Sequence, residues 1–289
     1  MAAAIIPKVS KLSTRVIRLL GCNPGIMTLQ GTNTYLVGTG SSRILIDTGD
    51  SNVPEYIDYL ARVLSSERVQ LEKIIITHWH HDHMGGVKDI FEKFAPGCEV
   101  LKHPRLQGET EDLPDGFPSP LTNLQDGQKI FTEGATLRVI QTPGHTTDHV
   151  VLHLEEEEAV FCGDCILGEG TTVFEDLHDY LLSLRKILEV NAKILYPGHG
   201  NIIESPAERI QYYLAHRQHR EEQILQVLAS FNWQLVTAMD IVRQAYKETP
   251  EHLYPAAEVN VNHHLEKLLK EKRVVHSEGR WKLANQSSL

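Results

Sequence analysis

The segment Thr77-His-Trp-His-His-Asp-His83 gathers four imidazoles and one carboxylate into seven consecutive residues. Neutral imidazole nitrogens and carboxylate oxygens are the ligands that zinc and similar cations bind. The β-branched run Ile74–Ile76 precedes the segment and Gly85-Gly86 follows it. This pattern predicts a buried strand that ends in a turn, from which a helix begins.

A turn of this kind can direct alternate side chains toward two different points. His78 and His80 can then face one metal ion while Asp82 and His83 face a second. A straight helix would place His78 and His80 on different faces, so the helical arrangement of zinc-binding histidines does not apply. The segment therefore predicts half of a two-metal site.

The residues around the segment alternate between strand and helix patterns. Residues 31–38 and 43–49 indicate paired strands, and residues 54–64 indicate a helix with proline in its first turn. A strand over 72–77 and a helix over 84–94 follow. This alternation is typical of a layered α/β domain.

Three further candidate ligands lie downstream, each at the end of an apolar strand pattern and beside glycine. His145 follows residues 137–140 within Thr-Pro-Gly-His, Asp164 follows residues 159–162, and His199 follows residues 193–196 within Pro-Gly-His-Gly. Loops at strand ends are where a rigid scaffold presents catalytic groups. Each residue alone is a weak signal, but the three in this order complete a ligand set.

The pattern changes after Pro206 to helices without strands. Helices are expected over about 207–229, 237–246 and 256–271, and a short hairpin over 274–283. Three helices followed by a small β-ribbon is the order of a winged-helix module. The expected domains are therefore residues 1–206 and residues 207–289.

The composition argues against several classes of protein: strongly basic nucleic-acid binders, membrane-spanning proteins and disulfide-rich proteins. The net charge of −10 gives no general attraction to nucleic acid, and no apolar run approaches the length of a membrane span. Four cysteines are too few for a disulfide framework, and Cys162 and Cys165 are expected to be packed thiols. Before Asp47 the chain has Lys and Arg but no acidic residue, which resembles a mitochondrial targeting bias. We expect the mitochondrial matrix, with the cytoplasm as the alternative.

The chain resembles the metallo-beta-lactamase superfamily over about residues 10–205, because it contains HxHxDH, then His, Asp and His, after an Asp on an early strand. The resemblance implies a four-layer αββα fold, followed here by the small winged-helix-like domain. It also implies two divalent metal ions, with zinc expected and manganese or iron as alternatives. The implied roles are one metal on His78, His80 and His145, a second on Asp82, His83 and His199, Asp164 as the bridge, and Asp47 orienting a ligand.

Within the superfamily the sequence is most similar to the beta-lactamase-like protein 2 family of single-strand-specific endoribonucleases. The similarity rests on Gly21–Gly25, Gly31–Gly40, Thr77–His80 and Gly163–Asp176. Those segments supply four candidate substrate contacts, which could equally be turn-forming residues: Asn33, Tyr35, Thr171 and Thr172.

The resemblance implies hydrolysis without a serine or cysteine nucleophile. Two dications roughly 3.5–4 Å apart can share a water and lower its pKa toward about 7, so that a metal-bound hydroxide is the nucleophile. Asp82 and Asp164 are the implied catalytic carboxylates. The expected reaction is cleavage of phosphodiester bonds in single-stranded RNA. The alternative is hydrolysis of a thioester, as in glyoxalase II or an acyl-carrier-protein thioesterase.

The C-terminal module is expected to cover the active site or to form a homodimer surface. Its third helix carries Glu258 and Glu266 among its polar residues, whereas a sequence-specific duplex binder would present a strongly basic face. Weak contacts to RNA are expected from a cluster of four cations: Lys267, Lys270, Lys272 and Arg273.

Overall fold

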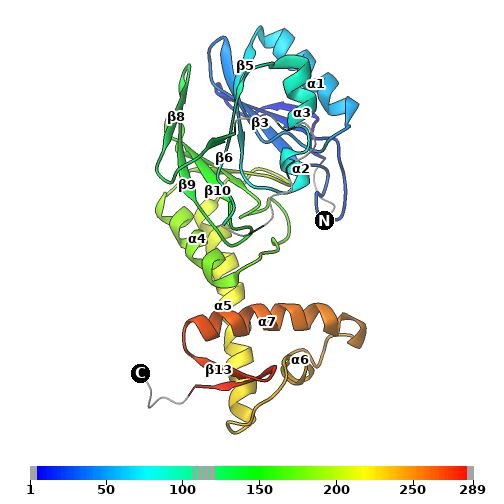
Figure 1. Cartoon of the computed structure of the whole chain (residues 1–289), viewed down its shortest axis with the longest axis vertical. Helices are drawn as coiled ribbons and strands as arrows, with labels where there is room; N and C mark the ends of the chain where they lie inside the picture. Colours follow the sequence, from blue (N-terminus) through cyan, green and yellow to red (C-terminus); the bar gives the residue numbers. More distant parts are fainter. Residues whose placement is uncertain (1–4, 107–108, 110–112, 114–116, 118–120, 285–289) are drawn as a thin grey trace. The chain divides into compact units, whose positions relative to one another are not determined.

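The structure is a computed structural model that describes residues 5–106, 109, 113, 117 and 121–284 (Figure 1). Its internal contacts divide the chain into two compact units. The first contains Met1–Glu175 and Leu182–Ile210, and the second contains Asp176–Leu181 and Gln211–Leu289. The second unit thus includes a short segment that the sequence patterns placed in the first domain.

The first unit contains a seven-stranded sheet in which the order of the strands follows the chain. Its first four strands are antiparallel neighbours, and β4, β5, β6 and β7 are parallel neighbours. The strands are β1 (Val9–Lys11), β2 (Val16–Leu20), β3 (Asn33–Val37), β4 (Ser42–Ile46), β5 (Gln70–Ile76), β6 (Glu99–Lys102) and β7 (Thr122–Asn123).

A second sheet of five strands has the order β12-β11-β10-β9-β8. All its neighbours are antiparallel except β11 and β12, which are parallel. The strands are β8 (Lys129–Thr132), β9 (Ala135–Gln141), β10 (Val150–Leu154), β11 (Ala159–Gly163) and β12 (Ile194–Pro197).

The two sheets pack face to face, and helices cover their outer faces (Figure 1). One core cluster joins residues of both sheets, including Val37 and Ile46 from the first and Leu137 and Leu152 from the second. The opposite face of the first sheet packs against α1 (Pro54–Glu67) and α3 (Val87–Phe94). On the second sheet lies α4 (Leu177–Glu189), whose Ser183 and Lys186 donate hydrogen bonds to carbonyls of Pro143 and Gln141. This is the expected four-layer αββα fold.

The strands and helices predicted from periodicity are present within a few residues of their expected bounds. The seven-stranded sheet also contains β6 (Glu99–Lys102), which the sequence patterns did not indicate. Cys162 and Cys165 are buried free thiols, so the expectation of packed thiols is confirmed.

The layered arrangement brings distant strand ends together. Asp47 follows β4, Thr77 and His78 follow β5, Asp164 follows β11, and His199 lies just beyond β12. Because each strand is buried between layers, its last residues are held rigidly while the loop that follows is free to carry polar groups. The site described below is built from these loops.

The second unit contains three helices and a two-stranded ribbon, the expected winged-helix order. The helices are α5 (Pro206–Ser230), which begins in the first unit, α6 (Ala238–Ala245) and α7 (Tyr254–Lys270), with a short 3₁₀ turn η1 (Glu251–Leu253) before α7. The ribbon pairs β13 (Val274–Ser277) with β14 (Arg280–Leu283). Of the helices within the described residues, none has the length and apolarity needed to cross a membrane.

Ion pairs engage cations at the C-terminal end of α7 and just beyond it. Lys267 is buried and pairs with Glu221 and Glu271, and Arg273 also pairs with Glu221. Lys267 is therefore unavailable for the RNA contact expected from the sequence.

A reciprocal capping box begins α6. Thr237 Oγ1 accepts a hydrogen bond from Asp240 N at 3.1 Å, and Asp240 Oδ2 accepts one from Thr237 N at 3.0 Å. We expect Thr237→Ala to lower the opening free energy of the α6 amides by about 1 kcal/mol, because the first helical turn loses its acceptor. Hydrogen exchange measures this value. Thr237→Ser, which keeps the hydroxyl, should change it little, and equal losses in both variants would contradict the assignment.

Candidate metal centre

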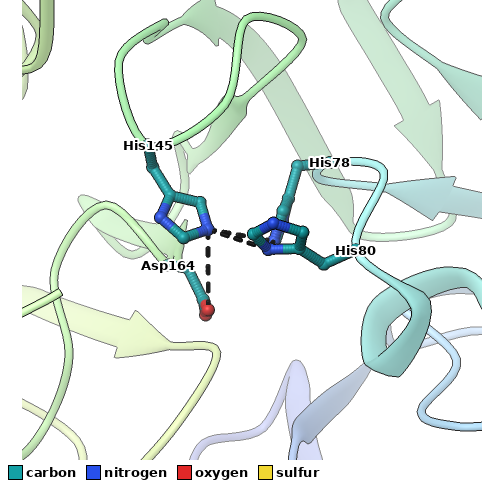
Figure 2. Close-up of side chains that lie close together, drawn as sticks. All are labelled: His78, His80, His145 and Asp164. Carbon is teal, nitrogen blue, oxygen red and sulfur yellow. Dashed lines mark hydrogen bonds and ion pairs between the residues drawn. The ribbon is translucent and has the colours of Figure 1, made fainter. Parts of the chain in front are cut away.

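Three histidines from two loops direct ring nitrogens at one point (Figure 2). His78 Nε2 lies 2.9 Å from His80 Nδ1 and 3.3 Å from His145 Nε2. His145 Nε2 lies 3.1 Å from His80 Nδ1. His78 and His80 come from the turn after β5, and His145 from the loop after β9. We refer to these three residues as cluster A.

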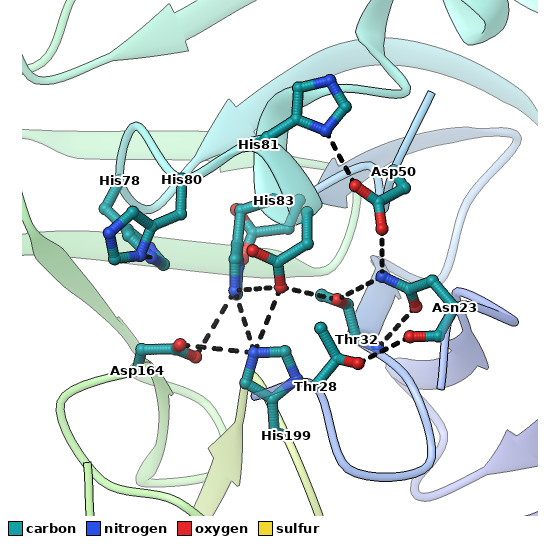
Figure 3. A network of polar contacts seen from close by, with 12 residues as sticks. Asn23, Thr28, Thr32, Asp50, His78, His80, His81, His83, Asp164 and His199 are labelled. Carbon is teal, nitrogen blue, oxygen red and sulfur yellow. Dashed lines mark hydrogen bonds and ion pairs between the residues drawn. The ribbon is translucent and has the colours of Figure 1, made fainter. Parts of the chain in front are cut away.

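A second group of ligand atoms lies beside the first (Figure 3). Asp82 and His83 lie on the four-residue helix α2 (His81–Met84), and His199 comes from the loop after β12. Asp82 Oδ2 is 3.3 Å from His83 Nε2 and 3.2 Å from His199 Nε2, and the two ring nitrogens are 3.3 Å apart. We refer to these three residues as cluster B.

The Asp164 carboxylate lies between the two clusters. Its Oδ1 is 3.4 Å from His83 Nε2, and its Oδ2 is 3.2 Å from His199 Nε2 and 3.8 Å from His145 Nε2. Gly198 makes room for this carboxylate, because a Cβ at position 198 would overlap Asp164 Oδ1. The bridging position that the resemblance implied for Asp164 thus matches the geometry.

Asp47 sets the orientation of one histidine in each cluster. Its backbone has a φ of 58°, a left-handed conformation that aspartate tolerates better than most residues. Its Oδ1 accepts from Thr77 N at 2.8 Å, and its Oδ2 accepts from Thr77 Oγ1 at 2.9 Å and from His83 Nδ1 at 2.8 Å. Since a carboxylate only accepts, the proton of His83 must be on Nδ1.

The same reasoning assigns the tautomers of cluster A. The Thr77 hydroxyl proton goes to Asp47, so Thr77 Oγ1 accepts from His78 Nδ1 at 3.0 Å. His145 Nδ1 donates to the Val173 carbonyl at 2.7 Å. His78 Nε2 and His145 Nε2 therefore both carry lone pairs.

The positions of these lone pairs show whether the residues suit a metal ion. Two nitrogen lone pairs 3.3 Å apart cannot hydrogen bond and repel each other unless a cation lies between them. Hydrogen bonds to the other ring nitrogen are the usual way in which proteins orient metal-binding histidines. The two clusters together offer five ring nitrogens and one carboxylate, and Asp164 adds a shared carboxylate, so this donor set fits two divalent cations.

The electrostatics differ between the two clusters. Burial, aided by the neighbouring rings, lowers the pKa of His80 to about 4 and that of His78 well below its usual range, so these rings stay neutral. In cluster B burial acts in the same direction, but the Asp164 and Asp82 carboxylates outweigh it and raise the pKa of His199 to about 9. Positive charge is thus stabilised beside His199, and a bound cation would supply it.

His149 is a buried histidine beside the site that the sequence analysis did not single out. Its Nε2 accepts from the backbone N–H of Asp164 at 3.2 Å, and its Nδ1 bonds to Thr142 Oγ1 at 2.8 Å. Gly163, which precedes Asp164, has a φ of 45° and lies so close to the His149 ring that a Cβ would clash. His149 therefore contributes to the placement of Asp164. In the sequence, its place four residues after the ligand His145, in Thr-Pro-Gly-His-Thr-Thr-Asp-His149, was the signal that could have indicated a role at the site.

A cavity of about 480 Å³ opens beside both clusters. Thr171 is exposed there, and Thr172 also lines the cavity but is nearly buried, with its hydroxyl 3.3 Å from His145 Nδ1. Among the described lining residues there is no Lys or Arg. The apolar part of the lining consists of Ile26, Met27, Leu29, Leu167 and Val173.

The expectation that Asn33 and Tyr35 contact substrate is wrong. Both side chains are buried and support the loop of His199. Asn33 Nδ2 donates to the carbonyls of Pro197 at 3.0 Å and Gly200 at 2.9 Å, and Tyr35 Oη donates to Pro197 at 2.6 Å. Strand alternation cannot distinguish a polar group facing a cavity from one that holds a neighbouring loop.

His81, the remaining histidine of the Thr77–His83 segment, lies outside both clusters. Its ring is exposed, and its Nδ1 lies 2.8 Å from Asp50 Oδ1 (Figure 3).

The family profile described as "Metallo-beta-lactamase superfamily" matches residues 27–199, and the profile "Beta-lactamase associated winged helix domain" matches residues 237–281. The chain belongs to the metallo-beta-lactamase superfamily. The superfamily match includes every residue of clusters A and B and Asp164.

Relatives of this superfamily member extend over both units. "Beta-lactamase-like protein 2 homolog" from Drosophila melanogaster is 54% identical over 93% of this chain and 92% of its own length. The protein of the same name from Caenorhabditis elegans is 46% identical over 92% and 88%. "Atrochrysone carboxyl ACP thioesterase" from Aspergillus fumigatus is 42% identical over 81% of this chain and 71% of its own. The chain therefore groups with the beta-lactamase-like protein 2 homologues.

Solved structures share the superfamily fold. A beta-lactamase domain protein from Burkholderia ambifaria has a TM-score of 0.77 at 20% identity and covers 96% of this chain and 93% of its own. A protein solved in a di-iron-bound form has a TM-score of 0.50 at 28% identity, covering 64% and 94%. The protein described here is a metal-dependent hydrolase of this superfamily, with a His/Asp cluster compatible with a dinuclear site.

Proposed function

We propose that this protein is an endoribonuclease that hydrolyses phosphodiester bonds in single-stranded RNA with two divalent cations, for which zinc is the first expectation. The observation that carries the two-cation part is the position of Asp164, whose two oxygens reach His83 of cluster B and His145 of cluster A at 3.4 and 3.8 Å. A carboxylate shared in this way can hold two cations close together, as two-metal hydrolases require.

His78, His80 and His145 would hold one cation, and Asp82, His83 and His199 the other, with Asp164 shared. When bound, two such cations supply an activated water and stabilise negative charge on the oxygens of the scissile group. The chain's own residues provide the rest. Contact with His83 and His199 outweighs the opposing effect of burial and keeps the pKa values of Asp82 and Asp164 well below their usual range, so both carboxylates stay ionised.

The cavity bears on how an RNA strand would bind. Since the described lining offers no Lys or Arg, a phosphate there would have its charge balanced by the cations of clusters A and B. Thr171 at the exposed rim remains a candidate contact to the strand. RNA as the substrate is supported by the two-domain similarity to the beta-lactamase-like protein 2 homologues.

Cleavage of labelled RNA tests the proposal. We expect metal-loaded protein to cleave a single-stranded oligoribonucleotide and to spare the same sequence in a duplex, while a chelator stops the reaction. Asp164→Ala is the matched control for a contaminating nuclease. Equal cleavage by the variant, or none by the wild type with two metals bound, would overturn the assignment.

Thioester hydrolysis is a second candidate, favoured by a specific observation. The cavity mouth presents Ile26, which is 98% exposed, together with exposed Met27 and Val173, and such a surface suits an acyl group. A relative at 42% identity is named a thioesterase. Thiol release from lactoylglutathione and from acyl-CoA measures this activity directly, and its absence alongside RNA cleavage would remove the candidate.

A further inference from the structure

Thr32 is a buried residue that contacts two ligands of cluster B, Asp82 and His199. Its side chain is fully buried just before β3, and its Oγ1 lies 2.9 Å from Asp82 Oδ2. Its backbone forms an isolated bridge with His199. None of its polar contacts reaches a residue of cluster A.

The direction of the hydrogen bond from Thr32 to Asp82 follows from its neighbours. Asn23 Nδ2 donates to Thr32 Oγ1 at 3.0 Å and to Asp50 Oδ2 at 2.9 Å (Figure 3). Asn23 Oδ1 accepts from Thr32 N at 2.9 Å. Because an ionised carboxylate only accepts, the single hydroxyl proton of Thr32 is directed at Asp82.

Asp82 is the ligand that most needs such a restraint. Its side chain is one-fifth exposed, whereas those of His83 and His199 are nearly inaccessible. A carboxylate at the edge of a cavity can rotate away from the ligand position unless a donor holds it. Thr32 donates such a hydrogen bond from inside the protein, and Asn23 holds Thr32 at both its N–H and its hydroxyl.

We propose that Thr32 is a positioning residue for the metal bound by cluster B, acting through Asp82, and that Asn23 keeps Thr32 in place. The hydrogen-bond network that runs from Asp82 through Thr32 to Asn23 also reaches the loop that lines the cavity. Asn23 lies in the same loop as Ile26 and Met27 of the cavity wall, and Thr28 Oγ1 in that loop donates to the Asn23 carbonyl at 2.6 Å. The inference rests on the two-cation site proposed above and is independent of the RNA substrate.

Metal titration of three variants tests the proposal. Hydrogen-bonding partners of metal ligands typically change affinity about 10–100-fold. We therefore expect Thr32→Val to weaken one of the two binding steps for Zn²⁺ by about 10–100-fold, and to leave the other within about twofold, in calorimetric titration of metal-free protein. Thr32→Ser, which keeps the donor, should restore wild-type binding.

Thr34→Val is the matched control for lost packing. Thr34 is also fully buried in the same segment, but its hydroxyl contacts Leu19 O and Tyr56 Oη and no ligand. Both binding steps should be unchanged in this variant. Equal losses in Thr32→Val and Thr34→Val, or unchanged binding in folded Thr32→Val, would overturn the proposal.

A double variant identifies the path through Asp82. If Thr32 acts only through this carboxylate, Thr32→Val added to Asp82→Ala, which removes the hydrogen-bond partner, should weaken binding no further, whereas independent effects would add. Additive losses would contradict the path. Failure of the wild type itself to bind two metals would instead count against the proposed site, so the two failures are distinguishable.

Discussion

Asp164→Asn is expected to abolish nearly all hydrolytic activity while the protein remains folded. The asparagine keeps the shape of the side chain but removes the negative charge between clusters A and B. Charge stabilisation by bound cations is worth several kcal/mol, and each ~1.4 kcal/mol is tenfold in rate, so a rate lower by about 10³-fold or more should follow. Hydrolysis assays together with metal analysis of the same preparation measure both consequences, and the metal content should fall below two per chain.

The chain offers a matched control for this substitution. Asp179 belongs to another group of close acidic and histidine side chains, with Asp176 and His178, but lies outside the two clusters and is partly exposed. Asp179→Asn should leave the hydrolysis rate and the metal content unchanged. Wild-type rate and two metals in Asp164→Asn would show that this carboxylate is not shared between the sites.

Asp47→Asn is expected to weaken both metal sites although Asp47 belongs to neither. The aspartate oxygens accept three protons, from Thr77 N, Thr77 Oγ1 and His83 Nδ1. The asparagine amide has two orientations. With its oxygen at the Oδ2 position, its NH₂ group faces the Thr77 N–H. In the opposite flip, with its oxygen at the Oδ1 position, its NH₂ group faces the His83 Nδ1–H. Either way one donor faces another.

The opposite flip would be relieved by moving the His83 proton to Nε2, where it blocks the ligand nitrogen. His78 loses its tautomer restraint at the same time, because Thr77 no longer donates to a carboxylate. A loss of about 10–100-fold at each site, or up to about 10⁴-fold for loading both, should result.

Titration calorimetry measures the affinities, and imidazole ¹⁵N shifts in the zinc-loaded protein report which His83 nitrogen carries the proton. Exposed Asp58→Asn on α1 is the control and should bind as the wild type does. A wild-type His83 tautomer and unchanged affinities in Asp47→Asn would contradict the role of Asp47.

The ligand residues could be predicted because their signals are local. Each of His78, His145, Asp164 and His199 follows an apolar strand pattern, the last three lie beside glycine, and a resemblance based on motifs carried the set as a whole. The helices and the β-ribbon of the C-terminal unit were predictable for the same reason, since amphipathic periodicity and capping residues are properties of short segments.

The supporting residues could not be assigned in this way. Asn33 and Tyr35 have the sequence signal of polar residues in a motif, and only the packing of β3 against the His199 loop shows that they face that loop and not the cavity. Thr32 lies 50 residues from Asp82 along the chain, and Asp47 lies 36 from His83.

By itself, the sequence determined the layered fold, the winged-helix unit and the seven candidate ligands. The tertiary structure decided which atoms of those ligands meet, through Asp47 and Thr77 for the tautomers and through Thr32 for Asp82. The physical reason is that a ligand type is a property of one residue, whereas its orientation depends on hydrogen-bond partners that the folding of two sheets brings from distant strands.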